Sequence, residues 1–202
     1  ESMESLNDFK SFLKWDNIID NEFFDRDGTS VLMYAVVKNN VNVVRDIIRI
    51  ARESSTTELN SLLSHRIVDL RSIGLPGNTS TLHIAMMMAS PEIVSMLLEY
   101  GANVHSVDVN GNDAAMFASA LGRSDNLQIW LERVKDWDLN RQNTVFGGCA
   151  LGNAVYMGAN KLETVKVLLD AGASLDYRTF SGGNVLTNAV ENEDSNPGVV
   201  RI

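Results

Sequence analysis

The chain has 202 residues, and its composition narrows the classes of protein to which it can belong. Hydrophobic residues make up 45% and charged residues 21%, with only three prolines, which excludes a disordered chain. The formal net charge of −9 argues against a nucleic acid or an anionic membrane surface as partner, because like charges repel. No apolar run approaches the roughly 18 residues of a membrane helix, so we expect no membrane insertion.

Cys149 is the only cysteine of the chain. An internal disulfide is therefore impossible, and the cysteine spacing of a zinc site is absent. We expect an intracellular, reducing compartment, either cytoplasm or nucleus.

The first predicted helix lies within residues 5–15. Its apolar residues share one helical face and are Leu6, Phe9, Phe12 and Leu13. They match only the second half of the helix pairs that follow, which predicts that residues 1–26 form a half-repeat covering the next unit. The alternative is a boundary of the sequence that happens to fall there.

A full helix pair is predicted next, from about Asp27 to Arg52. The buried side of its second helix consists of Val43, Val44, Ile47 and Ile48. An insert follows at about residues 53–76, with an apolar pattern between Leu59 and Leu63. Such inserts can carry function. We favour the alternative, an extended helix pair that packs against its neighbours.

Residues 77–109 carry the clearest pattern of the chain. The motif S-T-L-H-x-A starts at Ser80, a second helix with Leu97 on its inner face follows, and the motif Y-G-A-N-V starts at Tyr100. Both motifs resemble those of the ankyrin repeat, T-P-L-H-x-A and x-G-A-D-V, at the spacing of that family. The resemblance implies an all-α solenoid of stacked helix-turn-helix units joined by hairpin loops.

The same pattern recurs along the chain. Its apolar anchors are Leu32, Leu82, Ala115, Leu151 and Leu186, each followed three positions on by Ala35, Ala85, Ala118, Ala154 and Ala189. The last three steps between anchors are 33, 36 and 35 residues, close to the family period of about 33. The first step is 50 residues, which leaves about 17 for the insert.

These repeats divide one predicted domain, residues 1–202. Its parts are the half-repeat 1–26, repeat one with its insert 27–76, then 77–109, 110–143, 144–179 and the truncated 180–202. We expect the parent protein to continue past Ile202, because the second helix that starts near Pro197 is cut short.

The start of each first helix has its own signal. Two residues before the anchors stand Ser30, Ser80, Asp113, Cys149 and Asn184. All but Cys149 are residues whose side-chain oxygen accepts a hydrogen bond from the first backbone amides of a helix. The next position, usually proline in the family, holds other residues here, which removes pre-organisation without preventing the helix.

Candidate catalytic groups are few. His65, His83 and His105 share no periodicity, and the resemblance implies that His83 bonds adjacent hairpin loops. Cys149 is the strongest candidate nucleophile, because a thiol at a helix N-terminus can have a lowered pKa. Its place in a capping position favours a buried thiol that fills a small space. We therefore expect no enzyme, no catalytic residue, no cofactor and no metal.

Two further features of the loops have structural interpretations. Gly147-Gly148 and Gly182-Gly183 lack the Lys-Ser/Thr pair of a phosphate loop and are predicted to be hairpin turns. Trp137 stands where a small residue usually turns the chain. It is either a cover over the neighbouring hairpin or an anchor for a partner, and we favour the cover.

The predicted function is that of an interaction module, which binds a partner protein or peptide on its concave face and its hairpin tips. The predicted apolar stripe of the first helices consists of Met87, Met88, Ala120, Leu121, Tyr156 and Met157. Asn110, Asn112, Val145 and Phe146 are predicted to form the rim. The alternative is that neighbouring hairpins shield the stripe. We expect a monomer, and a partner with basic groups beside apolar anchors, because acidic residues surround the stripe.

Two other roles stay open. The chain can be a regulatory or positioning segment of a larger channel, kinase or other effector. It can also be a substrate, because loop asparagines such as Asn103 or Asn140 are hydroxylated in some members of the family that it resembles.

Overall fold

The computed structural model describes residues 29–67, 75–157 and 161–191. Over these ranges the chain forms ten α-helices, and its only strand-like pairings are two isolated bridges, Arg66 with Ser80 and Val107 with Asp113. The predicted all-α fold of repeated helix pairs is therefore confirmed. The half-repeat predicted for residues 1–26 and the helix predicted after Pro197 lie outside the described residues.

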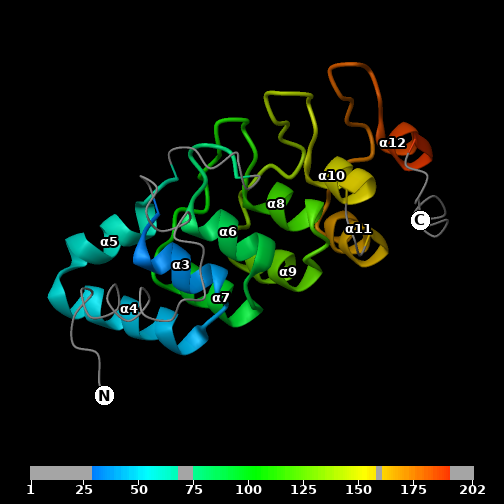
Figure 1. The fold of residues 1–202 in the computed structure, drawn as a ribbon. Coiled ribbons are helices and arrows are strands. Elements are labelled where there is room, and N and C mark those ends of the chain that lie inside the picture. Colours follow the sequence, from blue (N-terminus) through cyan, green and yellow to red (C-terminus); the bar gives the residue numbers. More distant parts are fainter. Residues whose placement is uncertain (1–28, 68–74, 158–160, 192–202) are drawn as a thin grey trace. The chain divides into compact units, whose positions relative to one another are not determined.

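The chain divides into two compact units, residues 1–103 and 104–202, and each is described by itself. Unit 1 contains the first five described helices (Figure 1). They are α3 (Val31–Val37), α4 (Val41–Ser54), α5 (Thr56–Ser64), α6 (Thr81–Met88) and α7 (Pro91–Glu99). Because α3 packs on α6 and α4 packs on α7, the pairs α3–α4 and α6–α7 are stacked.

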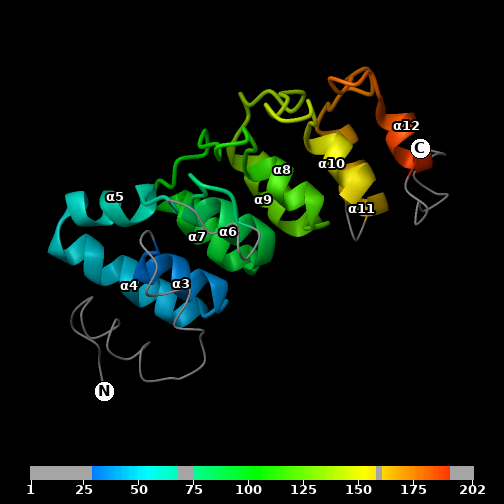
Figure 2. The ribbon, with the colours of Figure 1, turned by 45° about the horizontal axis from the view of Figure 1, so that its top comes forward.

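Unit 2 contains the other five. They are α8 (Ala114–Ala120), α9 (Ser124–Arg133), α10 (Ala150–Met157), α11 (Lys161–Asp170) and α12 (Val185–Glu191). The first helices α8, α10 and α12 pack in succession, and the second helices α9 and α11 pack on each other (Figure 2). Three long hairpin loops lead into α8, α10 and α12 and project from one side of these helices (Figure 1).

The helices begin at the predicted N-caps. Side chains of Ser30, Ser80, Asp113 and Asn184 accept from the amides of Met33, His83, Met116 and Thr187 at 2.8–3.1 Å. Cys149 takes the same role through sulfur, a weak acceptor, with the amide of Gly152 at 3.5 Å. Nδ1 of His83 accepts from the amide of Ser80 at 3.2 Å and closes a capping box.

Burial follows the repeat pattern with one exception. All five anchor alanines are buried, and so are the anchors Leu32, Leu82, Ala115 and Leu151. The fifth anchor, Leu186, is 60% exposed, unlike the other four. α12 packs against α10, and its residues Val185 and Ala189 are buried.

The described part of the insert holds one helix after the end of α4, and the helix pair favoured from the sequence stays a prediction. α4 continues to Ser54, and α5 packs on both α4 and α6. Leu59 and Leu63 are buried on its inner side, and the rest of α5 is mostly polar and exposed. The insert ends beside the next repeat, where the amide of Ile67 donates to the carbonyl of Thr79 at 2.9 Å.

Candidate binding surface

The residues of the predicted stripe differ in exposure. In unit 1, Met87 is half-buried and Met88 is 37% exposed. In unit 2, Ala120 is half-buried, whereas Leu121 and Tyr156 are exposed. The side chain of Met157 lies outside the described residues. Their assignment to a partner stays a prediction.

The predicted rim residues separate into two kinds. Val145 and Phe146 are exposed, as a contact surface requires. Asn112 is half-buried, and its side chain is engaged within the fold. Its Nδ2 donates to Oδ2 of Asp108 at 2.9 Å, and its Oδ1 accepts from Nδ2 of Asn143 at 3.1 Å. Asn112 therefore holds two hairpins together.

Asn143 is the centre of the hairpin that leads into α10, and the sequence reasoning missed it. Its side chain is buried, and Oδ1 faces the amides of residues 145, 146, 147 and 148 at 3.1–3.3 Å. One amide oxygen thus organises the whole turn, which displays Val145 and Phe146 on its outer side. An asparagine before a Thr-Val-Phe-Gly-Gly turn is the signal that points to this role.

Successive hairpins of unit 2 are also joined through their main chains. The amide of Thr144 donates to the carbonyl of Asn110 at 2.8 Å, and the amide of Phe180 donates to the carbonyl of Phe146 at 3.0 Å. Nε2 of Gln142 bridges the carbonyls of Gly147 and Arg178. These bonds fix the three tips side by side.

The three tips share an apolar residue that the sequence reasoning did not align. Val109, Val145 and Phe180 each lie two positions before a glycine with positive φ, and they are 53%, 60% and 66% exposed. Val145 alone was predicted as a site residue. Aligning the hairpins on these glycines is the signal that would have found the other two.

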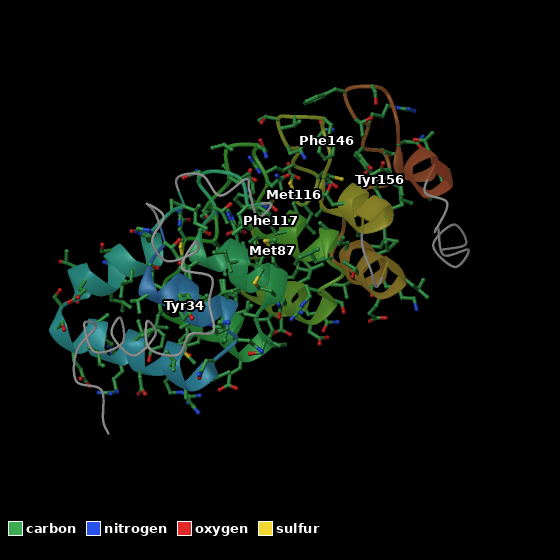
Figure 3. The ribbon with its side chains drawn as sticks, viewed as in Figure 1. Tyr34, Met87, Met116, Phe117, Phe146 and Tyr156 are labelled. Atoms are coloured by element: carbon green, nitrogen blue, oxygen red, sulfur yellow. The ribbon has the colours of Figure 1, made fainter. Side chains whose placement is uncertain are left out.

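The last two hairpins of unit 2 and the helices α10 and α12 enclose a hollow of about 750 Å³. It is lined by Phe146, Gly148, Gly152, Asn153, Tyr156, Thr179, Ser181, Gly182, Gly183 and Thr187. Figure 3 shows Phe146 on its hairpin and Tyr156 on α10. We call this hollow the aromatic groove.

Close approach of rings explains two glycines of unit 2, Gly147 on a hairpin and Gly152 on α10. The ring of Phe180 lies so near Gly147 that a Cβ there would come within 2.8 Å of it, and the φ of Gly147 is +75°. Tyr177, which is buried, occupies the space beside Gly152 that any side chain at that position would need. Glycine therefore lets aromatic residues cover the hairpins.

A second aromatic cluster contains Trp137 and supports the favoured structural interpretation. Its Nε1 donates to Oδ2 of Asp113 at 2.8 Å, and its ring meets the edge of Trp130 at 6.1 Å between centroids. The guanidinium of Arg141 lies over the same indole at 5.6 Å and 3.7 Å from Oδ2 of Asp113. Burial raises the pKa of the Asp113 carboxyl above its ordinary value, although the amide of Met116, the indole of Trp137, the guanidinium of Arg141 and the amide of Ala115 favour the charged form. Trp137 thus covers a helix start.

Cys149 does not have the surroundings of a nucleophile. It is fully buried beneath the start of α10, and burial raises the pKa of its thiol. The described histidines are also separate: His83 caps α6, and His105 packs against Trp137 at 5.1 Å between ring centroids. Among the described residues, no three His, Cys, Asp or Glu side chains group as ligands of a metal. Within the same residues, no helix is long and apolar enough to cross a membrane.

Comparison with known sequences gives one family match. The model of the ankyrin repeat matches residues 79–109, the stretch that carries both sequence motifs.

The relatives include three long proteins. B-cell lymphoma 3 protein homolog of Mus musculus is 29% identical over 85% of this chain and 36% of its own length. Phosphocholine transferase AnkX of Legionella pneumophila is 25% identical over 89% of this chain and 19% of its own length. Nuclear factor NF-kappa-B p105 subunit of Gallus gallus is 27% identical over 84% of this chain and 16% of its own length. The chain thus spans between 16% and 36% of the length of these relatives.

Proposed function

Because the chain belongs to the ankyrin-repeat family, whose repeats are protein-interaction modules, we propose that it binds a partner protein through unit 2. The contact surface consists of the exposed side chains of the first helices and the hairpin tips. The observation that carries the proposal is that three exposed aromatic residues, Phe146, Tyr156 and Phe180, lie around the last two hairpins of this unit. Aromatic residues are enriched among the anchors of protein interfaces.

The arrangement of the hairpins supports the same proposal. Backbone bonds and the buried Asn143 hold the tips in place before any partner arrives. A pre-organised surface loses little conformational entropy on binding, so its apolar contacts contribute more fully to affinity. The net charge of −9 favours a partner with basic groups around its apolar anchors. We further propose an intracellular, monomeric module without enzymatic activity of its own.

Introducing a negative charge on a first helix of each unit tests this proposal. Tyr156→Glu in unit 2 and Met88→Glu in unit 1 both place a carboxylate on an exposed apolar position of a first helix. Partners are captured from a lysate of the source cells with wild type and with each variant, after circular dichroism has shown unchanged helicity and melting. We expect Tyr156→Glu to abolish capture of a partner that wild type retains. Equal capture by all three proteins would remove unit 2 from the contact.

A second candidate function rests on the lengths of the relatives. The chain matches only 16% to 36% of those proteins, which suggests a segment that positions or regulates other domains. Two of the relatives are named as enzymes, phosphocholine transferase AnkX and a tyrosine-protein kinase of Hydra vulgaris. These names describe the relatives and not this chain. Comparing an intact parent protein with a version in which Tyr156 is changed to Glu tests this role. A changed localisation or activity of the other domains supports it, and an unchanged parent contradicts it.

A further inference from the structure

We propose that the aromatic groove of unit 2 binds an uncharged, proline-containing segment of the partner in the polyproline II conformation. This inference rests on the proposed function and names the chemistry of its ligand. The groove has the size of a small peptide site, about 750 Å³. Phe146 and Tyr156, which are 49% and 52% exposed, are the two aromatic residues among its lining.

The main chain at the edge of the groove argues against strand addition. That mode needs a row of unpaired backbone amides and carbonyls. Here the carbonyl of Phe146 accepts from the amide of Phe180, and the carbonyl of Gly183 accepts from the amide of Thr179 at 2.8 Å. Arg178 Nη1 donates to the carbonyl of Gly182 at 3.2 Å. The amide of Gly148 faces Oδ1 of Asn143 at 3.3 Å. An extended partner strand would therefore compete with bonds that already exist.

The lining also argues against a charged ligand. Its described polar groups are the hydroxyls of Thr179, Ser181 and Thr187 and the amide of Asn153, and no Asp, Glu, Lys or Arg is among the described residues that line the groove. A charged side chain entering it would lose water without meeting an opposite charge, which is unfavourable. The acidic character of the chain as a whole is thus absent from the groove itself, and basic groups of a partner would act only outside it.

A polyproline II segment needs neither unpaired main-chain groups at the edge of the groove nor a charged partner in its lining. It has no internal hydrogen bonds to preserve, its prolines have no amide donors that need acceptors, and its rings pack on aromatic faces. The fixed φ of proline lowers the entropy lost on binding. A partner helix is less suitable, because it needs apolar anchors along several turns, whereas the described lining offers two aromatic side chains among glycines and small polar residues.

An unbiased selection tests the inference. Random twelve-residue peptides displayed on phage are selected on the whole 202-residue chain. Enriched peptides are then synthesised with neutral ends and titrated by calorimetry against wild type, Phe146→Ala, Tyr156→Ala and the control Leu175→Ala. Leu175 is similarly exposed in unit 2 and does not line the groove. We expect proline-rich peptides that bind at least about tenfold more weakly to both groove variants and equally to the control, the loss typical of a truncated anchor.

The failures of the two proposals are distinguishable. Enrichment of alternating β-branched or charged peptides that still depend on Tyr156 overturns the polyproline II ligand and leaves the binding function of unit 2. Peptides whose affinity is the same for all four proteins overturn the groove as the site. A third outcome is that capture of a partner from lysate depends on Tyr156, whereas a capped decaproline probe and all selected peptides bind equally well to the Phe146 and Tyr156 variants. In that case the inference is wrong and the proposed function stands.

Discussion

Units 1 and 2 are built from the same helix pairs, and they differ in what they leave exposed. Among the described large apolar residues, unit 1 exposes Met88. Unit 2 exposes Val109, Leu121, Val145, Phe146, Tyr156, Leu175, Phe180 and Leu186. The buried positions recur because stacking requires them, whereas tip positions are free to vary. The difference is the reason that we propose the contact on unit 2.

The largest expected effect concerns the positions that both units share. Replacing Leu82 or Leu97, each buried between helices of unit 1, with Ala should lower the free energy of unfolding by about 2 to 5 kcal/mol. Leu186→Ala in unit 2 should change it by less than about 0.5 kcal/mol, because that side chain is exposed. Urea unfolding followed by circular dichroism measures all three. Losses below about 1 kcal/mol at both buried positions would contradict the shared core.

The second effect concerns the hairpin of unit 2 that is built around the buried side-chain amide of Asn143. Asn143→Ala removes the acceptor shared by the amides of residues 145–148 and should cost about 1 to 3 kcal/mol. Asn140→Ala is the matched control, because Asn140 is exposed and its Oδ1 accepts from the amide of Ser174 at 2.7 Å. Urea unfolding compares the two variants. An equal loss in both would mean that Asn143 does not organise the turn.

The third effect is a pH dependence at the start of α8. Because the pKa of Asp113 is raised in the folded chain, the native state binds this proton more tightly than the unfolded state. The resulting stability is full below the unfolded pKa and is lost as pH rises through the folded pKa. Asp113→Asn keeps an oxygen for the amide of Met116 and does not titrate. The stability of wild type relative to this variant should therefore fall with rising pH.

Urea unfolding of both proteins at a series of pH values from about 3 to about 7 measures that difference. Trp137 adds a second readout, because its indole nitrogen donates to the same carboxyl at 2.8 Å and its fluorescence should follow the titration. A relative stability that increases with pH would show that Arg141 and the hydrogen bonds outweigh burial.

The smallest expected effect concerns Cys149. Because its thiol is buried and its pKa is raised, iodoacetamide should label the native chain slowly at neutral pH and the urea-unfolded chain much faster. Mass spectrometry over time measures both rates. Fast labelling that is lost on unfolding would restore the catalytic hypothesis.

The helix starts and the buried positions of the helix pairs could be predicted from sequence. Helix starts at Ser30, Ser80, Asp113 and Asn184 and the buried anchor alanines follow from local chemistry and a period, both of which repeat along the chain. Leu186 occupies an anchor position but is exposed, so the repeat pattern alone does not decide whether an anchor is buried.

The candidate site was only partly predictable. Val145, Phe146 and Tyr156 were found because they occupy tip and first-helix positions. Asn143 and Phe180 were missed, because an asparagine that binds several amides and a ring that packs on Gly147 depend on three-dimensional proximity. Asn112 was assigned to the rim, and only its bonds to Asp108 and Asn143 show its structural role.

The central claim is that the partner contacts the aromatic groove of unit 2. Hydrogen–deuterium exchange of the chain, alone and with a partner captured as above, tests it most directly. We predict slower exchange in the complex at the hairpins of residues 142–148 and 176–184 and at the start of α12, with residues 81–99 of unit 1 unchanged. Protection confined to residues 81–99, with no change around Phe146 and Phe180, would contradict the account.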